Sequence, residues 1–174
     1  GEFTEGAGVH AAEALLEEAL PVFQAAGDDV ALCVGYTALG QVANMQLQMD
    51  AGRDACDRAA AHGERAGLAT ELLGWQAGFR HRGTLPVSAL LEWLDENEPQ
   101  GRRNPWLRAY RAGALARLGR LEEARAILAT SRAELADRGG GIALADSIGF
   151  ASEVELEAGD PAAAVELGVE ACSL

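Results

Sequence analysis

The sequence predicts an all-α fold, an α-α superhelix of about five helix hairpins, and three observations support this class. Ala and Leu dominate the composition while aromatic residues make up 5%, and Ala has the smallest free-energy cost of any residue in a helix. The runs of β-branched and aromatic residues that are typical of strands are missing. Small residues recur at a +4, +3 spacing, which places them on one face of a helix.

The small-residue pattern returns along the chain with a period of about 36 to 40 residues. The sets are Ala12, Leu16 and Ala19; Gly52, Cys56 and Ala59; Ser88 and Ala89; Ala124, Leu128 and Ser131; and Ala164, Gly168 and Ala171. Small residues at a helix crossing allow two backbones to approach closely, and larger side chains fill the space to the next pair. Repetition of this kind predicts stacked helix hairpins.

A partner helix precedes most of these sets and carries the larger side chains, among them Tyr36, Phe79, Tyr110 and Ile148. Glycines such as Gly119 and Gly159 mark the tight turns, and Leu47 takes the place of the turn glycine between the second and third helices. The helices are expected at residues 10–26, 30–47, 52–66, 69–82, 86–96, 104–118, 121–137, 142–158 and 161–173.

This pattern resembles the tetratricopeptide repeat, whose consensus is W-x2-L-G-x2-Y-x3-G-x4-A-x3-F-x2-A. The matching residues are Tyr36, Leu39, Gly40 and Ala59; Gly119, Leu121, Ala124 and Leu128; and Gly159, Ala164 and Ala171. The chain departs from it where Gly52 takes an Ala position and Arg108 and Arg111 stand where Trp and Leu are expected. The resemblance implies that residues 1–174 form a single tetratricopeptide-like repeat domain, a fragment of a longer chain. A nonrepetitive helical bundle is the alternative.

The segments "GTLPVSALLEWLDE" and "NPWLRAYRAGALARLGRLEEARAIL" also resemble the C-terminal repeat arrays of bacterial multidomain signalling regulators. Those chains combine repeats with a class III cyclase domain and an AAA-type ATPase, or with a LuxR-type DNA-binding domain. The resemblance implies a sensor or scaffold segment and carries over no catalytic residue.

The charge balance bears on the classes of partner. The net charge of −13 argues against direct nucleic-acid binding, which usually needs a basic face. No apolar run approaches the ~20 residues of a membrane span, and no signal peptide is visible. We therefore expect a cytoplasmic protein with Cys33, Cys56 and Cys172 as buried free thiols.

Motifs for chemistry are missing from the sequence. There is no GxxxxGK[ST] phosphate loop, GxSxG elbow, HxxxH pair or CxxC pair, and the glycine-rich "RGGGIA" follows no predicted strand. Acidic pairs such as Glu122 and Glu123 are expected on solvated helix faces. We expect no enzymatic activity, no cofactor and no metal.

A candidate partner-binding face follows from the tetratricopeptide register, in which the first helix of each hairpin lines the concave side. The inward positions are Thr37, Gln41, Asn44, Thr70, Arg80, His81, Trp106 and Arg117. An Arg and His cluster beside amides suits an acidic protein or peptide. The alternative is that these arginines form a solvated surface and pair with acidic residues of neighbouring second helices.

The function expected from these features is a protein-interaction or ligand-sensing module of a bacterial signalling or transcription regulator. A stand-alone scaffold for complex assembly and an unrecognised helical enzyme are the alternatives. The last helix carries Val165, Val169, Cys172 and Leu174, and we expect that no following repeat covers them, which predicts self-association through the ends of the array.

Overall fold

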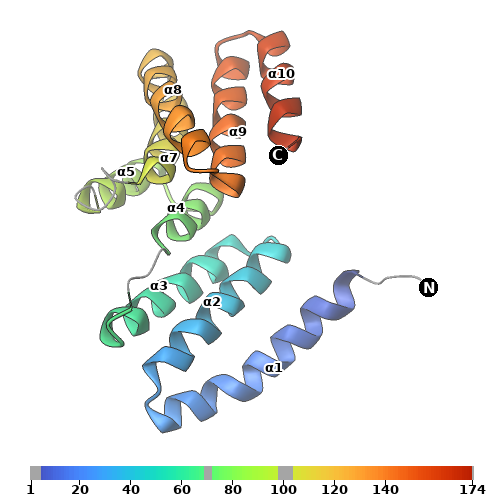
Figure 1. Cartoon of the computed structure of the whole chain (residues 1–174), viewed down its shortest axis with the longest axis vertical. Helices are drawn as coiled ribbons and strands as arrows, with labels where there is room; N and C mark the ends of the chain where they lie inside the picture. Colours follow the sequence, from blue (N-terminus) through green and yellow to red (C-terminus); the bar gives the residue numbers. More distant parts are fainter. Residues whose placement is uncertain (1–4, 69–71, 98–103, 174) are drawn as a thin grey trace. The chain divides into compact units, whose positions relative to one another are not determined.

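The computed structural model describes residues 5–68, 72–97 and 104–173, and every regular element within these ranges is an α-helix (Figure 1). The all-α class is therefore confirmed. The chain forms two compact units, Gly1–Thr84 and Leu85–Leu174. The boundary falls between the two helices that the sequence predicts as one hairpin around Gly83, and the membership of both units in one repeat domain stays a prediction.

The first unit contains four helices in the described part of the chain: α1 (Glu5–Ala26), α2 (Asp29–Met45), α3 (Met49–Arg65) and α4 (Leu73–Arg82). Helix α2 packs against both α1 and α3, and α4 packs against α3. A buried cluster of Leu32, Tyr36, Ala59 and Leu72 joins them.

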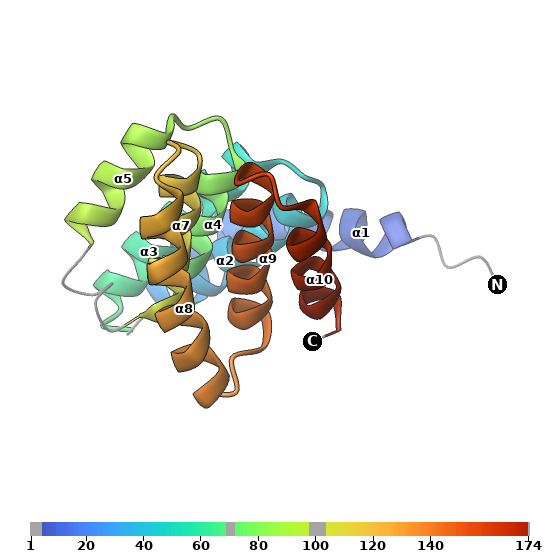
Figure 2. The same ribbon diagram turned by 90° about the horizontal axis from the view of Figure 1, so that it is seen from above.

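The second unit contains α5 (Val87–Glu96), α7 (Pro105–Ala116), α8 (Leu121–Asp137), α9 (Gly141–Glu157) and α10 (Pro161–Cys172). Helices α7 and α8 pack as one hairpin, and α9 and α10 as the next, with α9 also against both α7 and α8 (Figures 1 and 2). Helix α5 packs against α7. Each hairpin thus contacts its neighbour, as in stacked helical repeats.

Six of the turns between described helices share one geometry. In the turn that follows α2, the N–H of Leu47 donates to the carbonyl of Asn44 (3.1 Å) and the N–H of Gln48 to the carbonyl of Ala43 (2.8 Å), which is the Schellman arrangement. The same two bonds recur after α1, α3, α7, α8 and α9. Each turn has one residue with positive φ: Gly27, Leu47, Gly67, Gly119, Gly139 and Gly159.

These turn residues lie 20 positions apart within each unit, at 27, 47 and 67 and at 119, 139 and 159. Two helices with their turns therefore make a repeat of 40 residues, the upper end of the predicted period. The prediction that Leu47 replaces a turn glycine is confirmed, because its φ is +59°.

The small residues of α3 and α8 are buried at close helix crossings, as predicted. Ala59 and Ala124 are fully buried. A Cβ on Gly40 would lie 3.0 Å from the Cys56 sulfur, and one on Gly52 would lie 2.2 Å from the Phe79 ring. Burial also raises the pKa of the Cys56 thiol to about 12, so this thiol stays protonated at neutral pH.

Three expectations are wrong. Ser88 was expected on the packed face of α5, but it is exposed, and Leu90 and Leu94 are buried instead. Burial of leucine gains far more free energy than burial of serine. The helix expected at residues 104–118 ends at Ala116 instead, and Leu118, which lies in the turn, is 52% exposed. Cys172 is exposed rather than buried, because it lies in the last turn of α10.

Candidate partner-binding site

An apolar groove lies between α1 and α2 in the first unit. Its volume is about 670 Å³, and its lining includes Ala12, Leu15 and Leu16 of α1 and Ala38 and Met45 of α2. Of the lining residues that the structure describes, Gln41 alone carries a polar side chain. Large apolar side chains beside it remain in solvent, with Leu15 67% exposed and Met45 68% exposed.

The helix periods explain the groove. Leu15 and Val22 recur seven residues apart on one face of α1, and the α2 positions 30, 34, 38, 41 and 45 form a single stripe at +4, +4, +3, +4. Val22, Val30 and Val34 are all at least half exposed. Two adjacent apolar stripes thus run beside each other along the helix pair.

Contacts between residues outside the groove lining hold the two helices together. Gly35 of α2 leaves room for Leu20 of α1, because a Cβ at Gly35 would lie 2.8 Å from the Leu20 Cδ2. The Gln24 amide donates to the Tyr36 hydroxyl at 2.9 Å, and the Gln46 amide donates to Glu13 at 3.0 Å. The groove is therefore a formed feature of the helix pair, as ligand grooves generally are.

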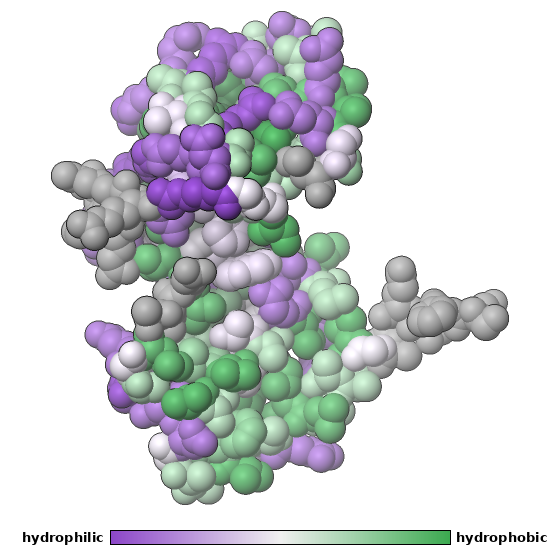
Figure 3. Space-filling view, in the orientation of Figure 1, coloured by the Kyte–Doolittle hydropathy of each residue, from purple (hydrophilic) through white to green (hydrophobic). Residues whose placement is uncertain are grey.

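The part of the chain that forms the groove carries acidic residues but no Lys or Arg. Residues 1–52 hold eight Asp and Glu residues and no Lys or Arg. Glu17 and Glu18 are exposed on α1. The space-filling view shows apolar residues gathered over the first unit, whereas hydrophilic residues cover much of the visible face of α7 and α8 (Figure 3).

The residues predicted from the tetratricopeptide register are divided between the two units. Gln41 and Asn44 are half-buried on α2, and Gln41 lines the apolar groove. Arg80 lies on α4 and donates to both carboxylate oxygens of Asp57 at 3.0 and 2.8 Å. The Arg80 side chain is 10% exposed, and the neighbouring His81 is buried. Thr70 lies outside the described residues.

Trp106 and Arg117 belong to the second unit. The Trp106 indole N–H donates to Asp146 at 3.1 Å, and the Tyr110 hydroxyl donates to the same carboxylate oxygen at 2.8 Å. These two bonds join α7 to α9. Arg117 is exposed at the C-terminal end of α7. The convergence of Arg80 and His81 with Trp106 and Arg117 stays a prediction.

Several arginines of the predicted basic region pair with acidic side chains of neighbouring helices, as the alternative interpretation expects. These pairs are Arg80 with Asp57, Arg108 with Glu134, and Arg111 with Asp95. The acidic partners lie on α3, α8 and α5, respectively. At these three positions the positive charge is matched within the unit.

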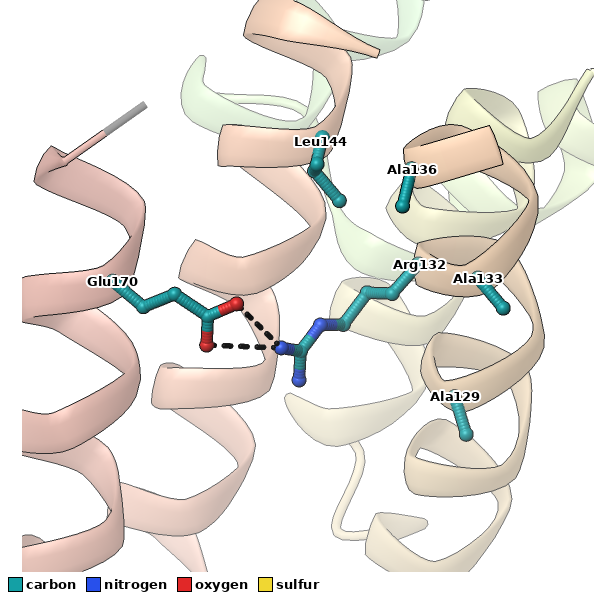
Figure 4. Close-up of a pocket in the computed structure, with 6 residues that line it drawn as sticks. All are labelled: Ala129, Arg132, Ala133, Ala136, Leu144 and Glu170. Atoms are coloured by element: carbon teal, nitrogen blue, oxygen red, sulfur yellow. Dashed lines mark hydrogen bonds and ion pairs between the residues drawn. The ribbon is translucent and has the colours of Figure 1, made fainter. Parts of the chain in front are cut away.

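A second hollow of about 300 Å³ lies among α8, α9 and α10 (Figure 4). Its walls are Ala129, Ala133, Ala136 and Leu144, and Arg132 crosses it to reach Glu170. The Arg132 guanidinium donates to both Glu170 oxygens at 3.1 Å. This ion pair fills the polar part of the hollow and links α8 to α10. We therefore interpret it as a contact that stabilises the packed hairpins and not as part of a ligand-binding site.

One histidine–carboxylate pair joins the ends of α2 and α3. His62 Nδ1 lies 2.7 Å from Asp29 Oδ1, and the Arg65 Nε donates to the same oxygen at 3.0 Å. These hydrogen bonds, that of His62 above all, hold the pKa of the Asp29 carboxyl below its usual value. The His62 ring also stacks on Tyr36 with centroids 5.5 Å apart. Each partner is thus engaged in closing the hairpin.

In the described part of the chain, no group of three His, Cys, Asp or Glu side chains is arranged to hold a metal ion. No helix there combines the length and apolar character that crossing a membrane requires.

The groove cannot be recognised from residue spacing, because Leu15 and Met45 follow the same helical spacing as core residues. The signal that points to it is the chain's distribution of charge: the first 52 residues contain no Lys or Arg. No protein-family model, curated protein or solved structure matches the chain.

Proposed function

We propose that this chain is a protein-interaction module built from tetratricopeptide-like helix hairpins and that it has no catalytic role. The observation that carries the proposal is the apolar groove between α1 and α2, where leucine, valine and methionine side chains remain in solvent. Contiguous exposed apolar surface of this kind marks interaction sites in soluble proteins.

The repeat geometry supports the same function. The Schellman turns recur every 20 residues in each unit, and α9 packs against both helices of the preceding hairpin. Stacked hairpins present helix faces and grooves to partners, which is the common use of helical repeats. The superhelix and the place of the module in a bacterial signalling or transcription regulator are parts of this proposal. Binding of an acidic ligand at Arg80 is not part of the proposal, because the Arg80 guanidinium already donates to the Asp57 carboxylate.

The test is selection of binding peptides from a displayed random library on the immobilised chain. We expect a family of peptides with a shared pattern that binds saturably and whose members compete with one another. Enrichment without any shared pattern, together with non-saturable binding, would contradict the function as an interaction module. A cyclase, ATPase or helix-turn-helix domain encoded in the same gene would support the regulatory setting.

A further inference from the structure

The α1–α2 groove has the dimensions of one helix. Its lining runs from Gly8 to Leu16 on α1 and from Ala38 to Met45 on α2, and the exposed Val22, Val30 and Val34 continue the two apolar stripes beyond the groove. At 1.5 Å per residue, about 15 residues of helix span about 22 Å, or four turns.

The apolar lining determines which face of such a helix would enter. Leu15, Val34 and Met45 stand in solvent, and a partner with its own apolar stripe at i, i+4 and i+7 would remove them from water. Gln41 offers an amide in the lining. An extended peptide would place unpaired backbone N–H and C=O groups against this lining, in which Gln41 alone among the described residues offers a polar side chain.

The charges beside the groove indicate which residues should flank the apolar stripe of the partner helix. Glu18 lies three residues after Leu15 and is therefore its neighbour on the α1 surface. Neither α1 nor α2 contains Lys or Arg, and Glu17 and Glu18 are exposed on α1. A partner with Lys or Arg beside its apolar stripe is complementary to this surface.

The same charge argues against two other occupants. A second copy bound through this face would bring carboxylates of one α1 toward those of the other. A membrane surface rich in anionic lipids would be repelled as well.

We propose that the α1–α2 groove binds a basic amphipathic helix of a partner protein, about four turns long, whose apolar stripe covers Leu15, Val34 and Met45. This inference rests on the proposed function and names its partner class. It differs from the partner predicted around Arg80 both in the place of the site and in the sign of the partner's charge.

The experiment measures binding of synthetic helical peptides of about 18 residues to the full chain by fluorescence anisotropy. One peptide carries a leucine stripe with flanking lysines, a second has glutamates in place of the lysines, and a third keeps the lysines but scrambles the leucines. We expect the first peptide to bind at least about tenfold more tightly than either of the others, and more weakly as salt rises from about 50 to about 500 mM.

Substitutions in the chain test whether the peptide binds in the α1–α2 groove. Leu15→Gln with Met45→Gln changes two exposed residues that line the groove, and Ile142→Gln with Val165→Gln is the matched control on exposed residues of the second unit. We expect the groove variant to lose about tenfold or more in affinity and the control to bind as the parent does. Circular dichroism checks that helix content is unchanged in each.

Three results would overturn the inference. One is equal affinity of the groove variant and the parent for the lysine peptide. Another is equal binding of the glutamate peptide. The third is a parent that forms dimers, or binds anionic vesicles, in a manner that the groove substitutions abolish. The proposed function would survive if library-selected peptides still bound the groove variant, so the two failures are distinguishable.

Discussion

Leu47 is the most direct point at which to perturb the fold, because it stands in a turn position that glycine fills in the other five turns. Its φ is +59° and its side chain is 80% exposed. A left-handed conformation costs a non-glycine residue about 1–2 kcal/mol. Glycine avoids this cost but loses more backbone entropy on folding, about 0.5–1 kcal/mol.

Leu47→Gly is therefore expected to stabilise the protein by about 0.5–1 kcal/mol. For a chain of this length the corresponding rise in melting temperature is about 1–4 °C. Urea unfolding followed by circular dichroism, together with thermal melts, measures both quantities.

Two controls separate the backbone effect from loss of the side chain. Leu47→Ala removes the side chain and keeps the backbone cost, so its stability is expected to match that of the parent. Gly27→Ala introduces the cost in the turn after α1, where a new Cβ would meet nothing within 4 Å, and should destabilise by about 1 kcal/mol. Equal stability of Leu47→Gly and Leu47→Ala would refute the reasoning.

The remaining predictions concern packing, thiol access and pH. Gly52→Ala should destabilise by about 1–3 kcal/mol in urea titrations, because its Cβ would lie 2.2 Å from the Phe79 ring; a parent-like midpoint would show that the crossing is looser. Cys172 is exposed, so a thiol reagent should label one cysteine rapidly in the native protein, and Cys172→Ser should abolish that fast phase. The Arg125 guanidinium holds the pKa of the Glu155 carboxyl below its usual 4.5. The stability that this pair contributes is thus present above that pH and is lost as pH falls through the lowered value. The urea midpoint of Glu155→Gln should therefore fall less steeply on acidification than that of the parent, and parallel profiles would count against the pair.

The sequence predicts the helices well because their signals are local. Small residues at a +4, +3 spacing and turn residues such as Gly119 and Gly159 determine where helices cross and end. The position of Leu47 in this pattern also predicts a turn there, although no glycine marks it. Local signals were weaker in α5, where Ser88 and Leu90 are close enough in sequence for either to belong to the buried face.

The candidate site was harder to predict because it depends on which neighbours a side chain meets. Arg80 is one example, since its partner Asp57 lies 23 positions earlier on another helix. Leu15 and Val34 are another, because spacing alone does not tell an apolar stripe that packs in the core from one that remains in solvent. In the structure, α1 packs against α2 through Leu20 and Gly35, and Leu15 and Val34 remain exposed.

Amide chemical-shift mapping tests the central claim most directly. The isotope-labelled full chain is titrated with the lysine-flanked helical peptide, and its amide spectra are recorded. The account predicts saturable shifts concentrated in residues 8–22 and 30–45, on the two helices that line the groove. Shifts confined to α9 and α10, or spectra unchanged at saturating peptide, would contradict it.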